Sequence, residues 1–319
     1  MKKVLITGAS GFAGSHLVDY LVLKKEYDIT GTYLSEQTLD NLSDSKDKIK
    51  LSKLDLLNNK DVSSLIEDLR PDYVFHLAAL SSAGDSFKNP FLTINNNISA
   101  QLNILESLRI ASLLSTKILI VSSAEVYGRV EEKDLPIDEE TSLKPDNPYG
   151  VSKIAQDFLG LQYNIAYEMP IIRVRPFNHI GARQTGNFVV SSFAKKIAMI
   201  EKGKMSPVLK VGNLNTKRDF TDVSDVVRAY DILMKKGKPG EVYNIGSGTS
   251  CKISDILDML LSFSNIAPKI EVDKDLLRPS DIPNLVCDSS KIKKETGWEA
   301  QVNIEETLRR TLDYWRKIV

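Results

Sequence analysis

A tyrosine followed four positions later by a lysine is the residue pair in this sequence best suited to proton transfer. Tyr149 and Lys153 stand one turn apart if the segment is helical, so their side chains share one face. A nearby ammonium favours the charged form of a phenol and lowers its pKa from about 10 toward neutral pH. The pair therefore predicts a tyrosine that gives or takes a proton during a reaction.

The spacing alone identifies nothing, because Tyr20 and Lys24 repeat it at the far end of another expected helix, where we expect a structural role. Tyr149 is distinguished by the apolar run at 117–121, which predicts a buried strand leading into Ser123. Chemistry in open α/β sheets lies beyond the carboxyl ends of the strands. From there Ser123 could hydrogen-bond a carbonyl oxygen beside Tyr149, so that two donors stabilise an oxygen that gains charge as hydride arrives. The alternative is that Ser123 only ends the strand.

Three glycines at three-residue spacing follow a short apolar run near the start of the sequence. Residues 4–6 predict a buried strand, and Gly8, Gly11 and Gly14 then lead into an amphipathic segment. In this setting the first glycine allows a tight turn, the second lets the backbone approach a pyrophosphate, and the third lets the helix pack on the strand. The alternative is an ordinary turn between a strand and a helix. We expect the phosphates of a dinucleotide to bind the helix start, at Gly8, Ser10, Gly11, Phe12, Ala13 and Gly14.

The second expected strand ends without the acid that selects NAD. Residues 31–35 read Gly-Thr-Tyr-Leu-Ser, whereas an acid about 20 residues beyond the glycines would bond the ribose 2′-hydroxyl and repel a 2′-phosphate. We therefore expect NADP(H) as the preferred cofactor, with NAD(H) as the alternative. Asp55 is a candidate partner for the adenine amino group, and the alternative role for it is that of a helix N-terminal acid.

Short β-rich runs alternate with amphipathic segments through the first half of the sequence, which predicts βαβ units in a parallel sheet covered on both faces. The expected fold class is α/β, with a doubly wound (Rossmann) parallel sheet and a smaller C-terminal α/β substrate lobe. We expect 1–176 to bind the cofactor, rejoined by parts of 220–247, and 177–319 to bind the substrate. Strands are expected at 3–7, 28–33, 73–77, 117–122, 171–175, 208–211 and 242–245, and helices at 13–24, 62–68, 91–114, 149–168, 188–201 and 223–235.

The composition argues against several classes of partner. Lys+Arg and Asp+Glu both number 42, so the net charge is zero and no basic surface is predicted for nucleic acid. No apolar run is nearly as long as the stretch of about 20 residues that spans a membrane. Cys251 and Cys287 are too few for a disulfide framework, and His76 and His179 have no partners at metal-ligand spacing. We expect a cytoplasmic protein with no nucleic-acid, membrane or metal partner, in which 35–50 is a solvated loop.

These motifs resemble those of the extended short-chain dehydrogenase/reductase superfamily, and the likeness spans essentially the whole chain. It rests on the glycine turn, Asp55, His76-Leu77-Ala78-Ala79, Asn97, Ser123, Tyr149 with Lys153, and Arg175-Pro176-Phe177-Asn178. The resemblance implies that Ser123, Tyr149 and Lys153 form the catalytic triad, and that Tyr149 and Lys153 also contact the cofactor. It further implies cofactor contacts at Asp55, Leu56, Leu77, Ala78, Ala79 and Pro176.

Within the superfamily, longer segments are similar to the GDP-4-keto-6-deoxy-D-mannose reductases, above all 175–181, 188–191, 211–214, 218–223 and 277–283. This likeness implies a GDP-hexose substrate and a homodimer formed through 91–114 and 149–168. The planar fork of arginine suits bidentate binding of a diphosphate, although Arg218 could instead pair with Asp219. The implied substrate contacts are Ser123, Asn178, Val189, Arg218 and Arg278.

The reaction implied by the resemblance is NAD(P)H-dependent reduction of the C4 ketone of GDP-4-keto-6-deoxy-D-mannose to GDP-D-rhamnose. Glu125 leaves an alternative open, since the related GDP-mannose 4,6-dehydratases carry a proton-abstracting glutamate two residues after the position of Ser123. Another NAD(P)-dependent nucleotide-sugar epimerase or dehydratase is a further alternative. A non-catalytic dinucleotide sensor is disfavoured by the intact set of Ser123, Tyr149 and Lys153.

Overall fold

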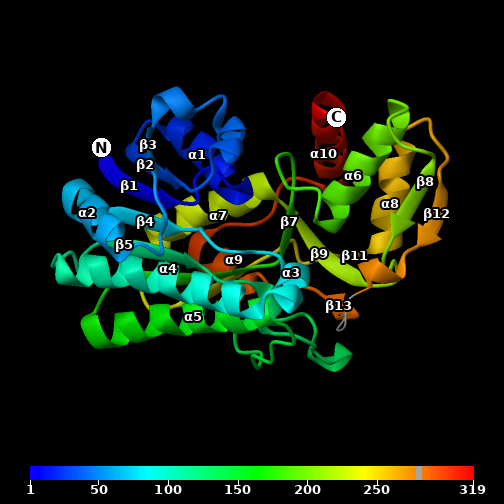
Figure 1. Ribbon diagram of the computed structural model, residues 1–319. Coiled ribbons are helices and arrows are strands. Elements are labelled where there is room, and N and C mark those ends of the chain that lie inside the picture. The colour runs from blue at the N-terminus through cyan, green and yellow to red at the C-terminus, as the bar shows by residue number, and fades with distance from the viewer. Residues whose placement is uncertain (278–281) are drawn as a thin grey trace.

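The computed structural model of the chain describes residues 1–277 and 282–319, which form two lobes side by side (Figure 1). The larger lobe is built on a parallel sheet of seven strands in the order β10-β6-β5-β4-β1-β2-β3. This confirms the doubly wound α/β class. The strands are β1 (Lys2–Thr7), β2 (Tyr27–Tyr33), β3 (Lys50–Lys53), β4 (Tyr73–His76), β5 (Lys117–Val121), β6 (Ile171–Pro176) and β10 (Val242–Ile245).

The strand order reverses between β1 and β4. From β1 the chain steps outward through β2 and β3, then returns to β4 on the other side of β1 and continues to β5 and β6. At such a switch point the loops beyond the carboxyl ends of two neighbouring strands diverge and leave a crevice. The glycine turn follows β1, and Leu77 follows β4, so both lie at this crevice.

Helices cover both faces of the sheet, which explains why its central strands are so apolar. One face carries α1 (Phe12–Lys24) and α7 (Val223–Lys236), and the other carries α2 (Asn59–Leu69), α4 (Pro90–Ile110) and α5 (Pro148–Tyr167) (Figure 1). Within β1, Val4 and Ile6 belong to the core under α1 and α7, whereas Leu5 belongs to the core under α2, α4 and α5. Alternate side chains of a strand point to opposite faces, so a run without polar residues is what a doubly covered sheet requires.

The smaller lobe has its own core, formed by residues such as Ala194, Ile197, Leu257 and Leu312. Its main sheet joins β7 (Asn178–Ile180), β9 (Lys217–Asp222), β11 (Ser250–Lys252) and β13 (Asn284–Leu285), and a second sheet pairs β8 (Val208–Val211) with β12 (Lys269–Val272). Its helices are α6 (Val189–Glu201), α8 (Ile253–Ser262) and α10 (Ile304–Ile318). Two short helices complete the fold, α3 (Ala83–Lys88) and α9 (Ser290–Thr296).

The chain passes between the lobes more often than the sequence analysis anticipated. Strand β10 pairs with β6 in the large sheet, and α7 packs beside α1. Residues 290–298 also return, because Ile292 of α9 and Trp298 are fully buried in the core that α1 and α7 share. We keep as a proposal that the larger lobe binds cofactor and the smaller one substrate.

The segment 35–50 is mostly exposed, as expected, but it is not the irregular loop that was expected. The segment contains two 3-10 helices, η1 (Glu36–Leu42) and η2 (Lys46–Lys48), and leads into β3. Leu42 is fully buried in the core, and the Asn41 amide donates to the backbone oxygen of Ser10 at 3.0 Å. A few apolar residues among many polar ones are enough to fix this segment against the glycine turn.

Candidate active site

The glycine turn between β1 and α1 is packed too closely to accept side chains. Gly8 has a φ of +68°, and a Cβ on Gly14 would lie 2.1 Å from the Gly8 oxygen. The N-cap of α1 is Gly11, whose lack of a side-chain oxygen leaves the first amides of the helix without a side-chain acceptor. Phe12 and Ala13 begin the helix, so their N–H groups point into the crevice at the positive end of the helix dipole. The arrangement fits the pyrophosphate of a dinucleotide.

The ends of β1 and β4 are fixed to each other next to this turn. The Thr7 hydroxyl accepts a hydrogen bond from the Ala78 amide at 3.2 Å and bonds the Nδ1 atom of His76 at 2.9 Å. Leu77, Ala78 and Ala79 are partly exposed along the crevice. These three residues line a path from the glycine turn toward α5, and their contact with a cofactor stays a prediction.

Asp55, the candidate partner of an adenine, lies in the turn after β3. One oxygen of Asp55 accepts from the Leu57 amide at 2.9 Å, in the turn before α2, while Leu56 is buried. The N-cap of α2 is Asn58, so Asp55 is not the capping residue of that helix. An acid does stand close to the end of β2, one residue beyond the segment that the sequence analysis considered: Glu36 pairs with Lys53 at 2.9 Å.

Ser123 and Tyr149 meet at the carboxyl end of β5. Ser123 is the N-cap of the 3-10 helix η3 (Ala124–Val126), and its hydroxyl accepts from the Glu125 amide at 3.2 Å. Burial raises the pKa of Tyr149 strongly, a hydrogen bond with Ser123 opposes that rise, and the charge of Glu125 adds to it. The two hydroxyl groups are therefore neighbours, as the proposed polarisation of a carbonyl oxygen requires.

Lys153 lies next to Tyr149 but does not act on it as the sequence suggested. Its ammonium donates to the Val121 oxygen at 2.8 Å and lies 5.8 Å from the centre of the Tyr149 ring. Burial lowers the pKa of Lys153 to about 7. The expectation that the lysine lowers the pKa of Tyr149 is wrong for this structure, because the loss of solvation is the larger effect. Tyr149 is protonated at neutral pH, as a tyrosine of ordinary pKa would be, and it can donate that proton to an oxygen that gains negative charge.

The first turn of α5 is held from three sides. Asn147 is its N-cap and accepts from the Gly150 amide at 2.8 Å, and Pro148 follows in the first turn. The Tyr149 amide donates to the Ser86 hydroxyl of α3 at 3.2 Å. The Asn97 amide of α4 donates to the Ser152 hydroxyl at 2.9 Å. These bonds fix the direction in which Tyr149 leaves the helix.

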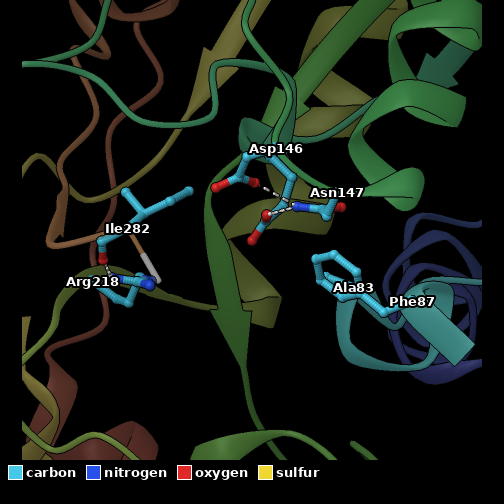
Figure 2. Close-up of a pocket in the computed structure, with 7 residues that line it drawn as sticks. Ala83, Phe87, Asp146, Asn147, Arg218 and Ile282 are labelled. Atoms are coloured by element: carbon cyan, nitrogen blue, oxygen red, sulfur yellow. Dashed lines mark hydrogen bonds between the residues drawn. The ribbon is translucent and has the colours of Figure 1, made fainter. Parts of the chain in front are cut away.

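A narrow cleft opens beside this turn and faces the smaller lobe. Figure 2 shows Arg218 and Ile282 on one side, Ala83 and Phe87 of α3 on another, and the loop before α5 between them. Neither α3 nor the pair Asn147-Pro148 before Tyr149 was predicted from the sequence. A signal for the pair was present, since an asparagine followed by a proline is typical of a helix start. The cleft is lined by Ala83, Phe87, Glu125, Asp146, Asn147, Arg218 and Ile282.

The residues expected to bind substrate are spread along the smaller lobe. Asn178 begins β7 and is partly exposed, Val189 begins α6 with 38% of its surface exposed, and Arg278 lies outside the described residues. Arg218 lines the cleft, and its guanidinium donates to the Ile282 oxygen at 2.6 Å. Pro176 ends β6 in a buried position.

The suggested pairing of Arg218 with Asp219 is wrong. Asp219 is fully buried and accepts from the amides of Ser247, Gly248 and Cys287 at 2.9 to 3.1 Å. Neighbouring residues of a strand point to opposite faces, so the strand that buries Asp219 presents Arg218 to the cleft.

The second tyrosine–lysine pair lies away from this cleft. Lys24 is the last residue of α1, and its ammonium sits 4.7 Å from the centre of the Tyr20 ring. His179 is also held by the protein, because its Nδ1 atom bonds the Phe177 oxygen and its ring stacks on Phe12 at 5.7 Å. Among residues 1–277 and 282–319, no group of His, Cys, Asp and Glu is arranged to hold a metal ion.

Comparison with known proteins agrees with this geometry. A model of the family described as GDP-mannose 4,6 dehydratase matches residues 5–311. The GDP-6-deoxy-D-mannose reductase of Pseudomonas aeruginosa is 34% identical over 100% of this chain and 98% of its own length. GDP-mannose 4,6 dehydratase 2 of Arabidopsis thaliana is 29% identical over 98% of this chain and 86% of its own.

Solved structures give the same result. The structure of RMD from Pseudomonas aeruginosa complexed with NADPH superposes with a TM-score of 0.88 at 33% identity, with both chains fully covered. The UDP-glucose 4-epimerase of Thermus thermophilus in complex with NAD superposes with a TM-score of 0.87 at 26% identity, over 99% of this chain and 100% of its own.

A doubly wound sheet, a glycine turn at the switch point and a buried serine, tyrosine and lysine together define an enzyme of the extended short-chain dehydrogenase/reductase class. Within that class, the chain belongs to the GDP-mannose 4,6 dehydratase family, whose model covers residues 5–311.

The buried amine of Lys153 gives a prediction that needs no substrate. Its pKa of about 7 means that the folded protein loses this proton as the pH rises through about 7. The unfolded chain keeps the proton until about pH 10.4, so Lys153 makes the free energy of unfolding rise with pH between these values. In NMR spectra of protein with ¹³C-labelled lysine, we expect one side-chain signal to titrate near pH 7 and to disappear in Lys153→Met. If the signal lost in Lys153→Met titrates near pH 10 instead, the assignment is wrong.

Proposed function

We propose that this protein is a reductase that converts the C4 ketone of GDP-4-keto-6-deoxy-D-mannose to the alcohol of GDP-D-rhamnose. The observation that carries the proposal is the placement of the buried Tyr149 hydroxyl beside the Ser123 hydroxyl, at the carboxyl end of β5. A ketone reduction needs a proton donor there. The 34% identity with the reductase of Pseudomonas aeruginosa over nearly its whole length supports this choice of substrate.

NADP(H) is the proposed cofactor, with NAD(H) as the alternative, and the glycine turn fits its pyrophosphate. When bound, NADPH would supply the hydride for reduction. Glu36 stands near the end of β2, but its charge is paired with Lys53 at 2.9 Å, so it repels a 2′-phosphate less than an unpaired acid would. The structure of RMD from Pseudomonas aeruginosa complexed with NADPH supports the preference.

The chain's own residues account for the rest of the reaction. The Ser123 hydroxyl binds the ketone oxygen and so polarises the carbonyl. Tyr149 delivers its proton to the same oxygen as the negative charge develops. Lys153 lies beside the Tyr149 ring, and its pKa of about 7 suits proton exchange at neutral pH. Arg218, across the cleft, faces the diphosphate of the substrate.

The second candidate is a GDP-mannose 4,6-dehydratase, and Glu125 is the residue that favours it. Its carboxylate lines the cleft, where a base could act on the sugar. Against this role, one carboxylate oxygen accepts a hydrogen bond from the Asn147 amide at 2.8 Å. The dehydratase of Arabidopsis thaliana is also the less similar of the two relatives, with 29% identity.

We further propose a cytoplasmic homodimer. Among residues 1–277 and 282–319, no helix is long and apolar enough to cross a membrane. The thiols of Cys251 and Cys287 are free, as in a reducing compartment. Helices α4 and α5 lie alongside each other on the outside of the large lobe (Figure 1), and pairing with a second copy would form a four-helix bundle. Large apolar side chains stand 45% to 83% exposed on these two helices, at Phe91, Leu92, Val151, Phe158 and Ile165.

A cofactor assay divides the two candidate reactions. The reductase oxidises one NADPH for each molecule of GDP-4-keto-6-deoxy-D-mannose, whereas a dehydratase converts GDP-mannose with no net change in cofactor. We expect the first result, measured as loss of the absorbance of the dihydronicotinamide ring and by analysis of the product. Formation of the keto sugar from GDP-mannose alone would overturn the proposal.

The matched control for that assay uses the two tyrosine–lysine pairs. Tyr149→Phe removes the proton donor and should slow reduction by about 10²- to 10⁴-fold, while NADPH binding measured by fluorescence stays intact. Tyr20→Phe, in the pair that lies outside the cleft, should keep its activity.

The exposed face of α5 predicts the oligomeric state. Phe158 is 50% exposed at the middle of that face, so Phe158→Glu would place a charge in the dimer interface and should yield a monomer in sedimentation experiments. Leu23→Glu, on the opposite side of the sheet in α1, is the control and should remain dimeric. A wild-type protein that sediments as a monomer at micromolar concentration refutes the dimer.

A further inference from the structure

Asn147 joins three polar groups at the edge of the cleft with a single side chain. Its oxygen accepts from the Gly150 amide at 2.8 Å, which caps the helix α5. Its nitrogen donates to a Glu125 oxygen at 2.8 Å and to an Asp146 oxygen at 3.0 Å, as Figure 2 shows for the loop before α5. Asn147 is only 7% exposed, so its donors and acceptor are directed almost entirely at the protein.

The chemistry of the partners fixes which way this amide points. A backbone amide such as that of Gly150 can only donate, so the atom of Asn147 that faces it must be the oxygen. Ionised carboxylates can only accept, so the NH₂ group must face Glu125. A rotated amide would lose all three bonds. The direction of the Glu125 side chain is therefore set by the same residue that starts the catalytic helix.

The backbone of Glu125 has no freedom to change that direction. A Cβ on Gly150 would lie 2.8 Å from the backbone oxygen of Glu125, which shows how closely the first turn of α5 packs on η3. The Glu125 amide is bonded to the Ser123 hydroxyl at 3.2 Å. Only rotation of its side chain could change where the carboxylate lies within the cleft, and the bond from Asn147 opposes that rotation.

The hydrogen at C5 of the proposed keto sugar is acidic, because C5 is bonded to the C4 carbonyl carbon. A carboxylate that reaches it takes the proton, the C–H electron pair forms an enolate, and the negative charge moves to the C4 oxygen. Ser123 and Tyr149 are hydrogen-bond donors to that oxygen and would stabilise the enolate as well as the alkoxide of reduction. Return of a proton from solvent to C5 closes the cycle with no change of oxidation state.

We propose that Asn147 is a positioning residue that holds the Glu125 carboxylate away from C5 of the bound keto sugar, and so commits the site to reduction without proton abstraction. The proposal rests on the proposed substrate. It assigns to the residue before Pro148 a part in selecting the reaction, in addition to capping the helix.

The test is exchange of the C5 hydrogen with deuterium in D₂O, measured by NMR on GDP-4-keto-6-deoxy-D-mannose with the enzyme and NADP⁺, which permits no net reduction. Asn147→Ser keeps an oxygen to cap the Gly150 amide, but its side chain is too short to hold Glu125 as well. We expect the wild type to exchange C5 at the rate of the enzyme-free sugar. Asn147→Ser should exchange it about 10²-fold faster, within the usual range for a positioned base. Asn147→Ser combined with Glu125→Gln should return to the wild-type rate.

A second variant separates this effect from the change of capping residue. Asn303 caps α10 in the same way, accepting from the Glu306 amide at 2.8 Å three residues on. Asn303→Ser makes the same change of cap at a helix that does not hold Glu125, and it should exchange C5 at the wild-type rate. Equal exchange in Asn147→Ser and the wild type overturns the proposal, and so does exchange that persists in the double variant. Conversion of GDP-mannose by the wild type would instead contradict the proposed function, while the exchange measurement would still report on Asn147.

Discussion

The contact between the first turn of α5 and the end of β5 is the constraint on which the site depends. There is no room for a side chain at Gly150, because an added Cβ would lie 2.8 Å from the backbone oxygen of Glu125. Deeper in the contact, the Ser122 hydroxyl donates to the Lys153 oxygen at 3.2 Å, and the Lys153 ammonium donates to the Val121 oxygen at 2.8 Å. A strand end and a helix start bonded in this way bring Ser123, Tyr149 and Lys153 together, although 127–147 separates the two elements along the chain.

The contact between α5 and β5 also buries the amine of Lys153. His76 lies near Lys153, but burial lowers the pKa of His76 to about 3, so it is neutral and adds no second cation.

One turn further along α5, the buried Asp157 binds Arg173 at 2.6 Å and Arg175 at 2.8 Å, both on β6. Removing one member of such a group leaves the others buried without compensation and is strongly destabilising. The charged residues of β6 thus fix the position of α5 along the sheet.

Local patterns in the sequence were sufficient for the fold and for the centre of the site. A continuous apolar run such as 4–6 predicts a strand covered on both faces, and the structure places its residues in two different cores. The glycine turn and the pair of Tyr149 and Lys153 are also local motifs, each contained in a short stretch of chain. The burial of Tyr149 depends on distant residues, however. For this reason the sequence predicted a lowered pKa for Tyr149, whereas burial raises it.

The remaining parts of the site come from distant segments. Ala83 and Phe87 reach the cleft from α3, which no motif connects to Tyr149, and Asp219 binds a backbone loop 28 residues away. Leu42 shows the same limit for the fold, since nothing within 35–50 indicates that the core of α1 has a place for it. Such contacts depend on how the two lobes and their elements pack together, and no local pattern in the sequence predicts them.

The direction of hydride transfer is the central claim, and the position of a deuterium label in the product tests it most directly. With NADPH that carries deuterium at both C4 positions of the nicotinamide and GDP-4-keto-6-deoxy-D-mannose as substrate, reduction places one deuterium at C4 of the sugar. NMR of the product should show that label in GDP-D-rhamnose, with none at C6. A label at C6, or a product that carries no label, would contradict this account.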